Sequence, residues 1–115
     1  MKAKVYPLTN TPSEIEATAS HFCLHIEIIS ATLAKGVTVI NNVINSKDID
    51  TTISWCRSLG ANIKKSNDKL IIKGINNKIN YHNSLFVCGN TSTTAKLMIP
   101  ILCTVQQPFG IKANK

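Results

Sequence analysis

The stretch over residues 37–59 changes its apolar pattern part-way along, and this change limits the folds that the chain can adopt. Residues 37–44, "VTVINNVI", are rich in β-branched side chains and predict a strand. Ser46 then caps a helix predicted over 47–59, whose first turn holds Asp48 and Asp50, where the helix dipole favours acids. A strand that leads into an amphipathic helix is typical of α/β proteins.

The spacing of apolar residues predicts two helices in the first half of the chain. The helix over 47–59 is expected to bury a stripe formed by Ile49, Ile53, Cys56 and Leu59. A helix over 21–35 is predicted with a similar stripe, formed by Phe22, Ile26, Ile29 and Leu33. Gly36 and Gly60 follow these stripes and are expected to end the two helices.

Turn residues divide the rest of the chain into short elements. The predicted elements are a strand at 2–6, a hairpin over 61–75, a strand over 84–89, a helix over 91–105 and a strand over 109–115. Asn67-Asp68 forms the hairpin turn, and Pro100 is expected to kink the last helix or delay its start. The resulting order, β-α-β-α-β-β-β-α-β, predicts an α/β fold with mixed strand pairing.

The length of 115 residues suits one modest domain. Residues 1–20 are expected to hold the first strand and a connector, which is extended over 14–20. Residues 21–115 are expected to form a single α/β domain.

The charge of the chain favours small anions over nucleic acids as partners. Twelve of the 13 basic residues that give the net charge of +7 are lysines, and they are spread along the sequence. Nucleic-acid binders usually cluster basic residues, often arginines, beside aromatic side chains, so no nucleic-acid partner is expected. A dispersed positive charge weakly attracts phosphorylated metabolites.

The chain is expected to be cytoplasmic. It has no run of 18 apolar residues, so no membrane span is predicted, and its first residues lack the apolar core of a signal peptide. The four cysteines are far apart and form no C-x-x-C pair, which argues against a zinc site and a disulfide framework. Scattered cysteines in an aliphatic chain are usually buried, reduced thiols.

No metal site is expected. His21 and His25 are four residues apart on one helix, a spacing at which two imidazoles can share a metal ion. The sequence offers no third ligand for such a pair.

The turn at 89–96, "GNTSTTAK", is small, rich in hydroxyl groups and followed by Lys96. The amide groups at the start of the following helix would hold an anion there. A hydroxyl-rich helix cap explains the same residues without a ligand. Both interpretations stay open at this point.

Three regions of the chain resemble one enzyme family. The family's patterns are S-K-S-x-x-x-R in a first helix, N-x-L-x-S-x-D at the start of a second, and G-N-[SA]-G-T-x-x-R at a strand–helix turn. The stretches "LAKGVTVINNVINSKDIDTTISWCRSLGANI" and "CGNTSTTAKLMIPIL", with the helix that begins near Ser20, are similar to these regions. The chain thus resembles the N-terminal part of 5-enolpyruvylshikimate-3-phosphate synthase, or 3-phosphoshikimate 1-carboxyvinyltransferase.

The resemblance implies a fold and a reaction. Members of the family repeat a βαβαββ unit, and this chain would hold one such unit and part of a second. They transfer an enolpyruvyl group from phosphoenolpyruvate to shikimate 3-phosphate, in the shikimate pathway to aromatic amino acids, and they need no cofactor. Both phosphorylated compounds are therefore the expected partners.

The resemblance also implies substrate-binding positions. Ser20 matches the first serine of the first pattern, Asp48 the acid of the second, and Asn90 and Thr93 the third. These four residues are the expected substrate-binding residues.

Other positions that align with the family site are substituted. His21, Phe22 and Ile26 stand where the first pattern has lysine, serine and arginine, and Phe22 and Ile26 are expected to pack instead as part of the helix stripe. Ser92 and Lys96 replace the second glycine and the arginine of the third pattern. Because a lysine lacks the bidentate fork of arginine and apolar side chains donate no hydrogen bond, the isolated chain is expected to be inactive.

Two alternatives to this function remain. A partial unit leaves strand edges and helix faces uncovered, which would suit a non-catalytic α/β scaffold or a self-associating module. The turn at 89–96 alone would suit a small phosphate-binding domain.

Overall fold

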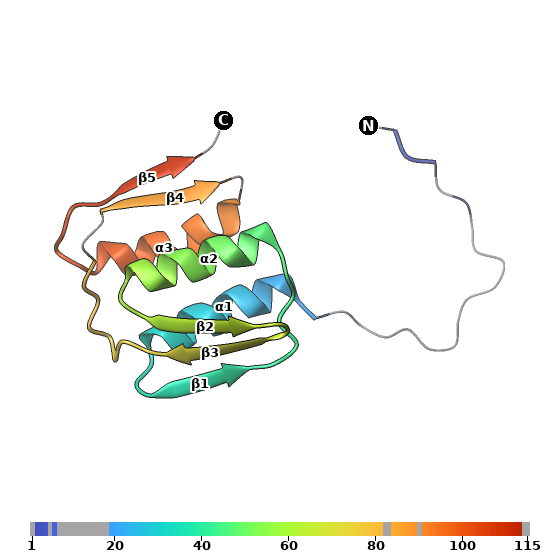
Figure 1. Ribbon diagram of the computed structural model, residues 1–115. Coiled ribbons are helices and arrows are strands. Elements are labelled where there is room, and N and C mark those ends of the chain that lie inside the picture. Colours follow the sequence, from blue (N-terminus) through green and yellow to red (C-terminus); the bar gives the residue numbers. More distant parts are fainter. Residues whose placement is uncertain (1, 5, 7–18, 82–83, 90, 114–115) are drawn as a thin grey trace.

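Three helices lie between two small sheets in the computed structural model, which describes residues 2–4, 6, 19–81, 84–89 and 91–113 (Figure 1). The elements in chain order are α1 (His21–Leu33), β1 (Val37–Ile40), α2 (Lys47–Ser58), β2 (Asn62–Ser66), β3 (Lys69–Lys73), β4 (Leu85–Gly89), α3 (Ser92–Cys103) and β5 (Gly110–Ala113). α1 and α2 pack on the sheet of β1, β3 and β2, while α2 and α3 pack on β4.

The strands pair in both directions, as the element order predicts. The first sheet has the order β1-β3-β2 and is antiparallel throughout, with Val39 opposite Ile71 and Ile63 opposite Ile72. The second sheet pairs β4 with β5 in parallel, and α3 forms the crossover between them. The mixed pairing is therefore divided between two sheets.

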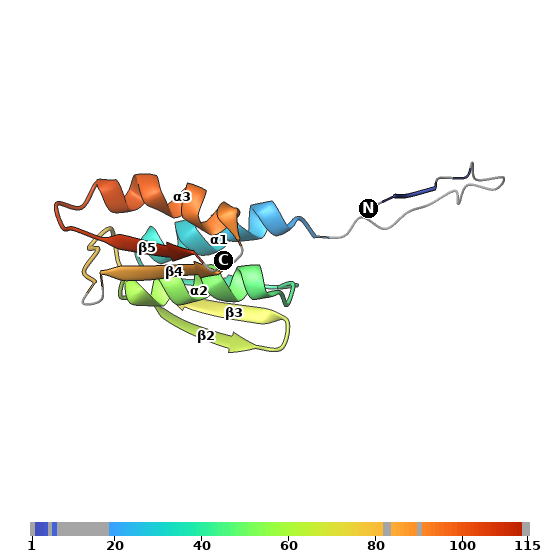
Figure 2. The same cartoon turned by 90° about the horizontal axis from the view of Figure 1, so that it is seen from above.

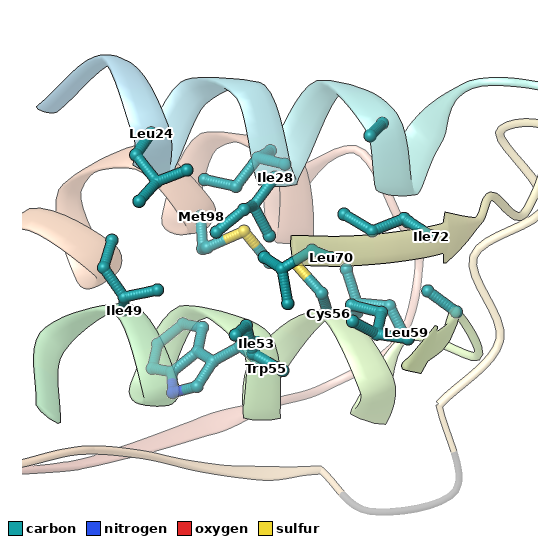
Figure 3. Close-up of a cluster of buried hydrophobic side chains, with 14 of the residues drawn as sticks. Leu24, Ile28, Ile49, Ile53, Trp55, Cys56, Leu59, Leu70, Ile72 and Met98 are labelled. Atoms are coloured by element: carbon teal, nitrogen blue, oxygen red, sulfur yellow. The ribbon is translucent and has the colours of Figure 1, made fainter. Parts of the chain in front are cut away.

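The core lies where the helices meet the first sheet. Figure 3 shows side chains from α1, α2, α3 and β3 pointing into one space, among them Leu24, Ile53, Leu70 and Met98. The predicted stripe of α2 is confirmed, because Ile49, Ile53, Cys56 and Leu59 are each at most 2% exposed. Burial of each such side chain stabilises the fold by about 1.5–3 kcal/mol.

The predicted stripe of α1 is wrong at its first two positions. Phe22 is 55% exposed and Ile26 41% exposed, whereas Leu24 and Ile28 of the same helix are buried. The predicted set, which includes Phe22 and Ile26, overlaps along the sequence with the set of Leu24 and Ile28. α1 turns Leu24 and Ile28 toward β3 and the other helices (Figure 3). Tertiary contacts, rather than helical spacing, decide which set is buried.

One predicted strand is shorter than expected, and another is not found among the described residues. The strand predicted over 37–44 ends at Ile40, because Asn42 adopts a left-handed conformation with φ of 58° and the Val43 amide donates instead to the Asp68 carbonyl. Residues 2–4 and 6 lie in no strand, so the first strand is not found in the described part of 2–6. Residues 14–18 of the predicted connector lie outside the described residues.

The end of α1 is closed by a distant segment instead of by Gly36. The helix ends at Leu33, and Ala34 is already extended. The amides of Ile75, Asn76 and Asn77, in the loop after β3, donate to the carbonyls of Thr32, Ala34 and Leu33. A Cβ atom on Gly74 would collide with the carbonyl oxygens of Ala31 and Ala34, so this close approach requires glycine.

α3 begins at Ser92 and continues through Pro100 to Cys103, so the proline does not delay its start. Pro100 lies on the exposed side of the helix, where water can satisfy the carbonyl that its missing amide leaves unpaired.

Candidate functional site

All three helices begin at the same end of the molecule (Figures 1 and 2). The first turn of a helix leaves backbone amides unpaired and carries a partial positive charge, so this end favours anions. It also gathers predicted site residues from three separate parts of the sequence: Ser20 and His21 at α1, Asp48 at α2, and Ser92 and Thr93 at α3.

At the start of α1, the Ser20 hydroxyl oxygen accepts a hydrogen bond of 3.3 Å from the Cys23 amide and so caps the helix. Ser20 also lines a hollow of about 230 Å³ beside Asn41 and Asn42, at the end of β1. His21, Phe22 and Ile26 are exposed on the first turns of the helix. The two apolar side chains therefore face solvent near the site.

At the start of α2, the two aspartates have different surroundings. Asp50 forms an ion pair of 2.7 Å with Lys65 of β2. Asp48 is exposed in the first turn of the helix. Ser46 caps this helix as predicted, accepting from the Ile49 amide at 3.2 Å.

At the start of α3, the described residues show no hydroxyl cap of the kind that one of the two interpretations of this turn requires. Thr91 is the N-cap residue, but its side chain makes no capping hydrogen bond, and its buried hydroxyl oxygen has no hydrogen-bond partner among the residues that the structure describes. Ser92 and Lys96 are exposed, and Thr93 is half-buried. Asn90 lies outside the described residues, so its expected role stays a prediction.

A buried chain of hydrogen bonds joins the three helices just below these starts. The Thr52 hydroxyl of α2 lies 2.7 Å from His25 Nδ1 of α1 and 2.7 Å from the Thr94 hydroxyl of α3. His25 is 2% exposed, and Thr52 and Thr94 are fully buried. Each residue lies within about two turns of the start of its helix. These hydrogen bonds therefore fix how the three helix starts are arranged.

The surroundings of His25 favour its neutral form. Burial lowers the pKa of its imidazole below 6.5, the nearby Asp48 carboxylate opposes this shift, and His21 adds to it. At neutral pH the uncharged imidazole therefore forms one hydrogen bond with the Thr52 hydroxyl.

Sequence reasoning missed Thr52 and Thr94. Each is a threonine inside a helix, at a position that the predicted apolar stripes do not include. The pair of His21 and His25 is split, because His25 is buried against Thr52 while His21 is exposed. Among the described residues, no three of His, Cys, Asp and Glu come together as a metal site would require.

Comparisons with known proteins agree on one family. The family model for EPSP synthase (3-phosphoshikimate 1-carboxyvinyltransferase) matches residues 5–113. The chain belongs to the EPSP synthase family.

The similarity to curated members of the EPSP synthase family covers most of this chain but little of theirs. The 3-phosphoshikimate 1-carboxyvinyltransferase of Methanobrevibacter smithii is 39% identical over 104 residues, which are 88% of this chain and 23% of that protein. That of Clostridium perfringens is 38% identical over 95 residues, 79% of this chain and 22% of that protein. The chain thus spans less than a quarter of the length of these relatives.

Solved EPSP synthase structures share the fold. Two structures of the enzyme from Acinetobacter baumannii superpose with TM-scores of 0.74 and 0.78 at 20% sequence identity. They cover 79% and 83% of this chain, and 21% and 22% of the solved chains. The expected α/β architecture is therefore confirmed.

None of the helices in the described part of this EPSP synthase family member has the length and apolar character that a membrane span needs.

Proposed function

We propose that the end of the molecule where the three helices begin is a half-site for phosphorylated substrates, shikimate 3-phosphate and phosphoenolpyruvate. The observation that carries the proposal is that Ser20, Asp48 and Thr93 lie at the starts of three helices that begin at the same end of the molecule. Membership of the family supports it, and the resemblance noted in the sequence implies that these residues align with positions in three family patterns. In the same proposal, residues 21–115 form one α/β domain, which residues 1–20 precede.

The helix starts supply the chemistry for holding phosphate. Their free amides are hydrogen-bond donors that need no reorganisation, and the exposed Lys96 adds a positive charge on α3. Asn90 is expected to contribute from the turn before α3. Binding of this kind needs no metal and no cofactor.

The same end of the molecule lacks the groups for turnover. Enolpyruvyl transfer develops charge that preorganised donors must stabilise. His21, Phe22 and Ile26 stand where the family pattern has a lysine, a serine and an arginine, and the two apolar side chains point to solvent without a donor. Ser92 adds a side chain where the pattern has glycine. We therefore infer that the isolated chain binds substrate weakly and does not convert it.

We further infer that the chain works in the cytoplasm, where its phosphorylated ligands are made and where exposed thiols stay reduced. The free Cys23 and Cys103 are exposed.

Amide NMR of the whole chain, titrated with shikimate 3-phosphate, tests the half-site. We expect shifts at Ser20, Asp48 and 92–96, and about tenfold weaker binding for Lys96→Ala because a charge-assisted contact is lost. Lys78→Ala, in the loop after β3, is the matched control and should bind like the unmodified chain. A well-dispersed spectrum that does not change up to millimolar ligand would refute the half-site.

A second function, self-association, is favoured by one specific observation. β1 is an edge strand of its sheet, and Val37, Val39 and Ile71 are 64%, 55% and 43% exposed on the face that it shares with β3. An apolar sheet face beside a free edge is a common site of strand-to-strand association.

A further inference from the structure

Thr52 occupies a position from which one oxygen atom contacts all three helices. Its hydroxyl lies 2.7 Å from His25 Nδ1 in α1, 2.7 Å from the Thr94 hydroxyl in α3, and 3.4 Å from the Asp48 carbonyl in its own helix. A hydroxyl has one proton and two lone pairs, so three contacts use its full capacity.

This arrangement tolerates little movement of one helix against another. His25, Thr52 and Thr94 are at most 2% exposed, so water cannot replace a hydrogen bond that breaks among them. A helix that slid or rotated would leave a buried polar atom unpaired, and an unpaired buried polar atom costs more than the bond itself contributes.

The network also lies directly beside the proposed half-site. Thr52 begins the helical turn that follows Asp48, and Thr94 follows Thr93 in the first turn of α3. His25 lies one turn after His21 in α1. The relative placement of the three helix starts is therefore what the network fixes.

We propose that Thr52 is a positioning residue, which holds the first turns of α1, α2 and α3 in the arrangement that lets Ser20, Asp48 and Thr93 meet one phosphorylated ligand. The positioning itself follows from the contacts of Thr52. Only its consequence for a ligand rests on the proposed function.

The first test uses the chain without ligand. Thr52→Val keeps the shape of the side chain and removes the hydroxyl, Thr52→Ser keeps the hydroxyl, and Ile53→Val is a matched control that alters the core at the next position. Thr52→Val should shift the amide resonances of 92–94 and the His25 ring nitrogens, Thr52→Ser should restore them, and Ile53→Val should leave them in place.

The second test adds inorganic phosphate as the probe. Thr52→Val should bind phosphate about tenfold more weakly at 92–96, while Thr52→Ser and Ile53→Val stay within about threefold of the unmodified chain. If Thr52→Val does not fold, Thr94→Val removes the α3 link alone. It should shift the amides of Ser92 and Thr93 and weaken phosphate binding to the same degree, while the His25 ring nitrogens stay in place because their contact with Thr52 remains.

The possible outcomes separate the two proposals. If the unmodified chain does not bind phosphate, the half-site is refuted, and the ligand-free spectra still decide whether Thr52 positions the helices. If Thr52→Val leaves the resonances of 92–94 and of His25 unchanged, the positioning role is refuted whatever the phosphate result. If Thr52→Val and Ile53→Val shift the same resonances equally, Thr52 serves the core only.

Discussion

At the scale of single residues, the four cysteines show how burial sets reactivity. Burial raises the pKa of the Cys56 thiol to about 11, and Cys88 is also buried, with its sulfur 3.5 Å from the Lys112 carbonyl. Cys23 and Cys103 are exposed. The expectation of buried thiols is thus right for two of them and wrong for the other two, because each exposed cysteine lies on the solvent side of its helix.

Thiol labelling of the native chain should therefore modify two positions. With N-ethylmaleimide at neutral pH, we expect Cys23 and Cys103 to react within minutes, and Cys56 and Cys88 to react only after denaturation. Peptide mass spectrometry identifies the labelled sites. Rapid labelling of Cys56 in the native chain would contradict the packing around α2.

His25 should make stability depend on pH. Its folded-state pKa is lowered from 6.5 because of burial, so the unfolded chain binds the proton more readily. Stability is then full above pH 6.5 and falls as the pH drops from 6.5 toward the lowered pKa. Urea unfolding at pH 7.5 and 5.0 measures this loss. His25→Asn should lose less stability over the same range, and an equal loss would mean that other groups cause it.

At the scale of elements, local signals explain which predictions succeed. The amphipathic stripe of α2, its Ser46 cap and the turn at Gly60 all lie within or beside the helix, so the sequence predicts it well. The face of α1 depends on which of two overlapping apolar sets meets β3, and spacing cannot decide that. The contact of Thr52 with His25 and Thr94 joins three helices, so no local pattern contains it.

The close contact at the end of α1 predicts a contrast between two glycines. Gly74→Ala should destabilise the chain by about 1–3 kcal/mol, because its Cβ would meet the carbonyl oxygens of Ala31 and Ala34. Gly110→Ala should be nearly neutral, since its Cβ would lie 3.4 Å from the flexible Leu85 side chain. Thermal unfolding compares the two variants, and an equal effect would mean that Gly74 has more room than its contacts show.

At the scale of the whole molecule, the arrangement of layers leaves part of the first sheet uncovered. Within the part of the chain that the structure describes, β1 pairs with β3 alone. A groove of about 670 Å³ runs between this strand and α1, lined by small residues such as Ser30 and Ala34. α3 packs on β4 of the second sheet. The free edge is therefore the place where another strand would add.

Self-association through this edge should depend on concentration. Sedimentation velocity between about 10 µM and 1 mM should show a rising average mass, because an exposed apolar edge is a template for strand pairing. Val39→Lys places a charge on that edge and should keep the chain monomeric, whereas Ser54→Lys, exposed on α2, should not. A monomer at every concentration would leave self-association without support.

The closure of α1 by the loop after β3 has a consequence for the order in which the chain folds. The last carbonyls of the helix, at Thr32, Leu33 and Ala34, find their partners only in residues 75–77, after the β2–β3 hairpin. During synthesis, α1 therefore emerges before that hairpin but keeps an open end until the hairpin has left the ribosome. The hairpin and the end of α1 should consequently gain protection from hydrogen exchange together, as one cooperative unit.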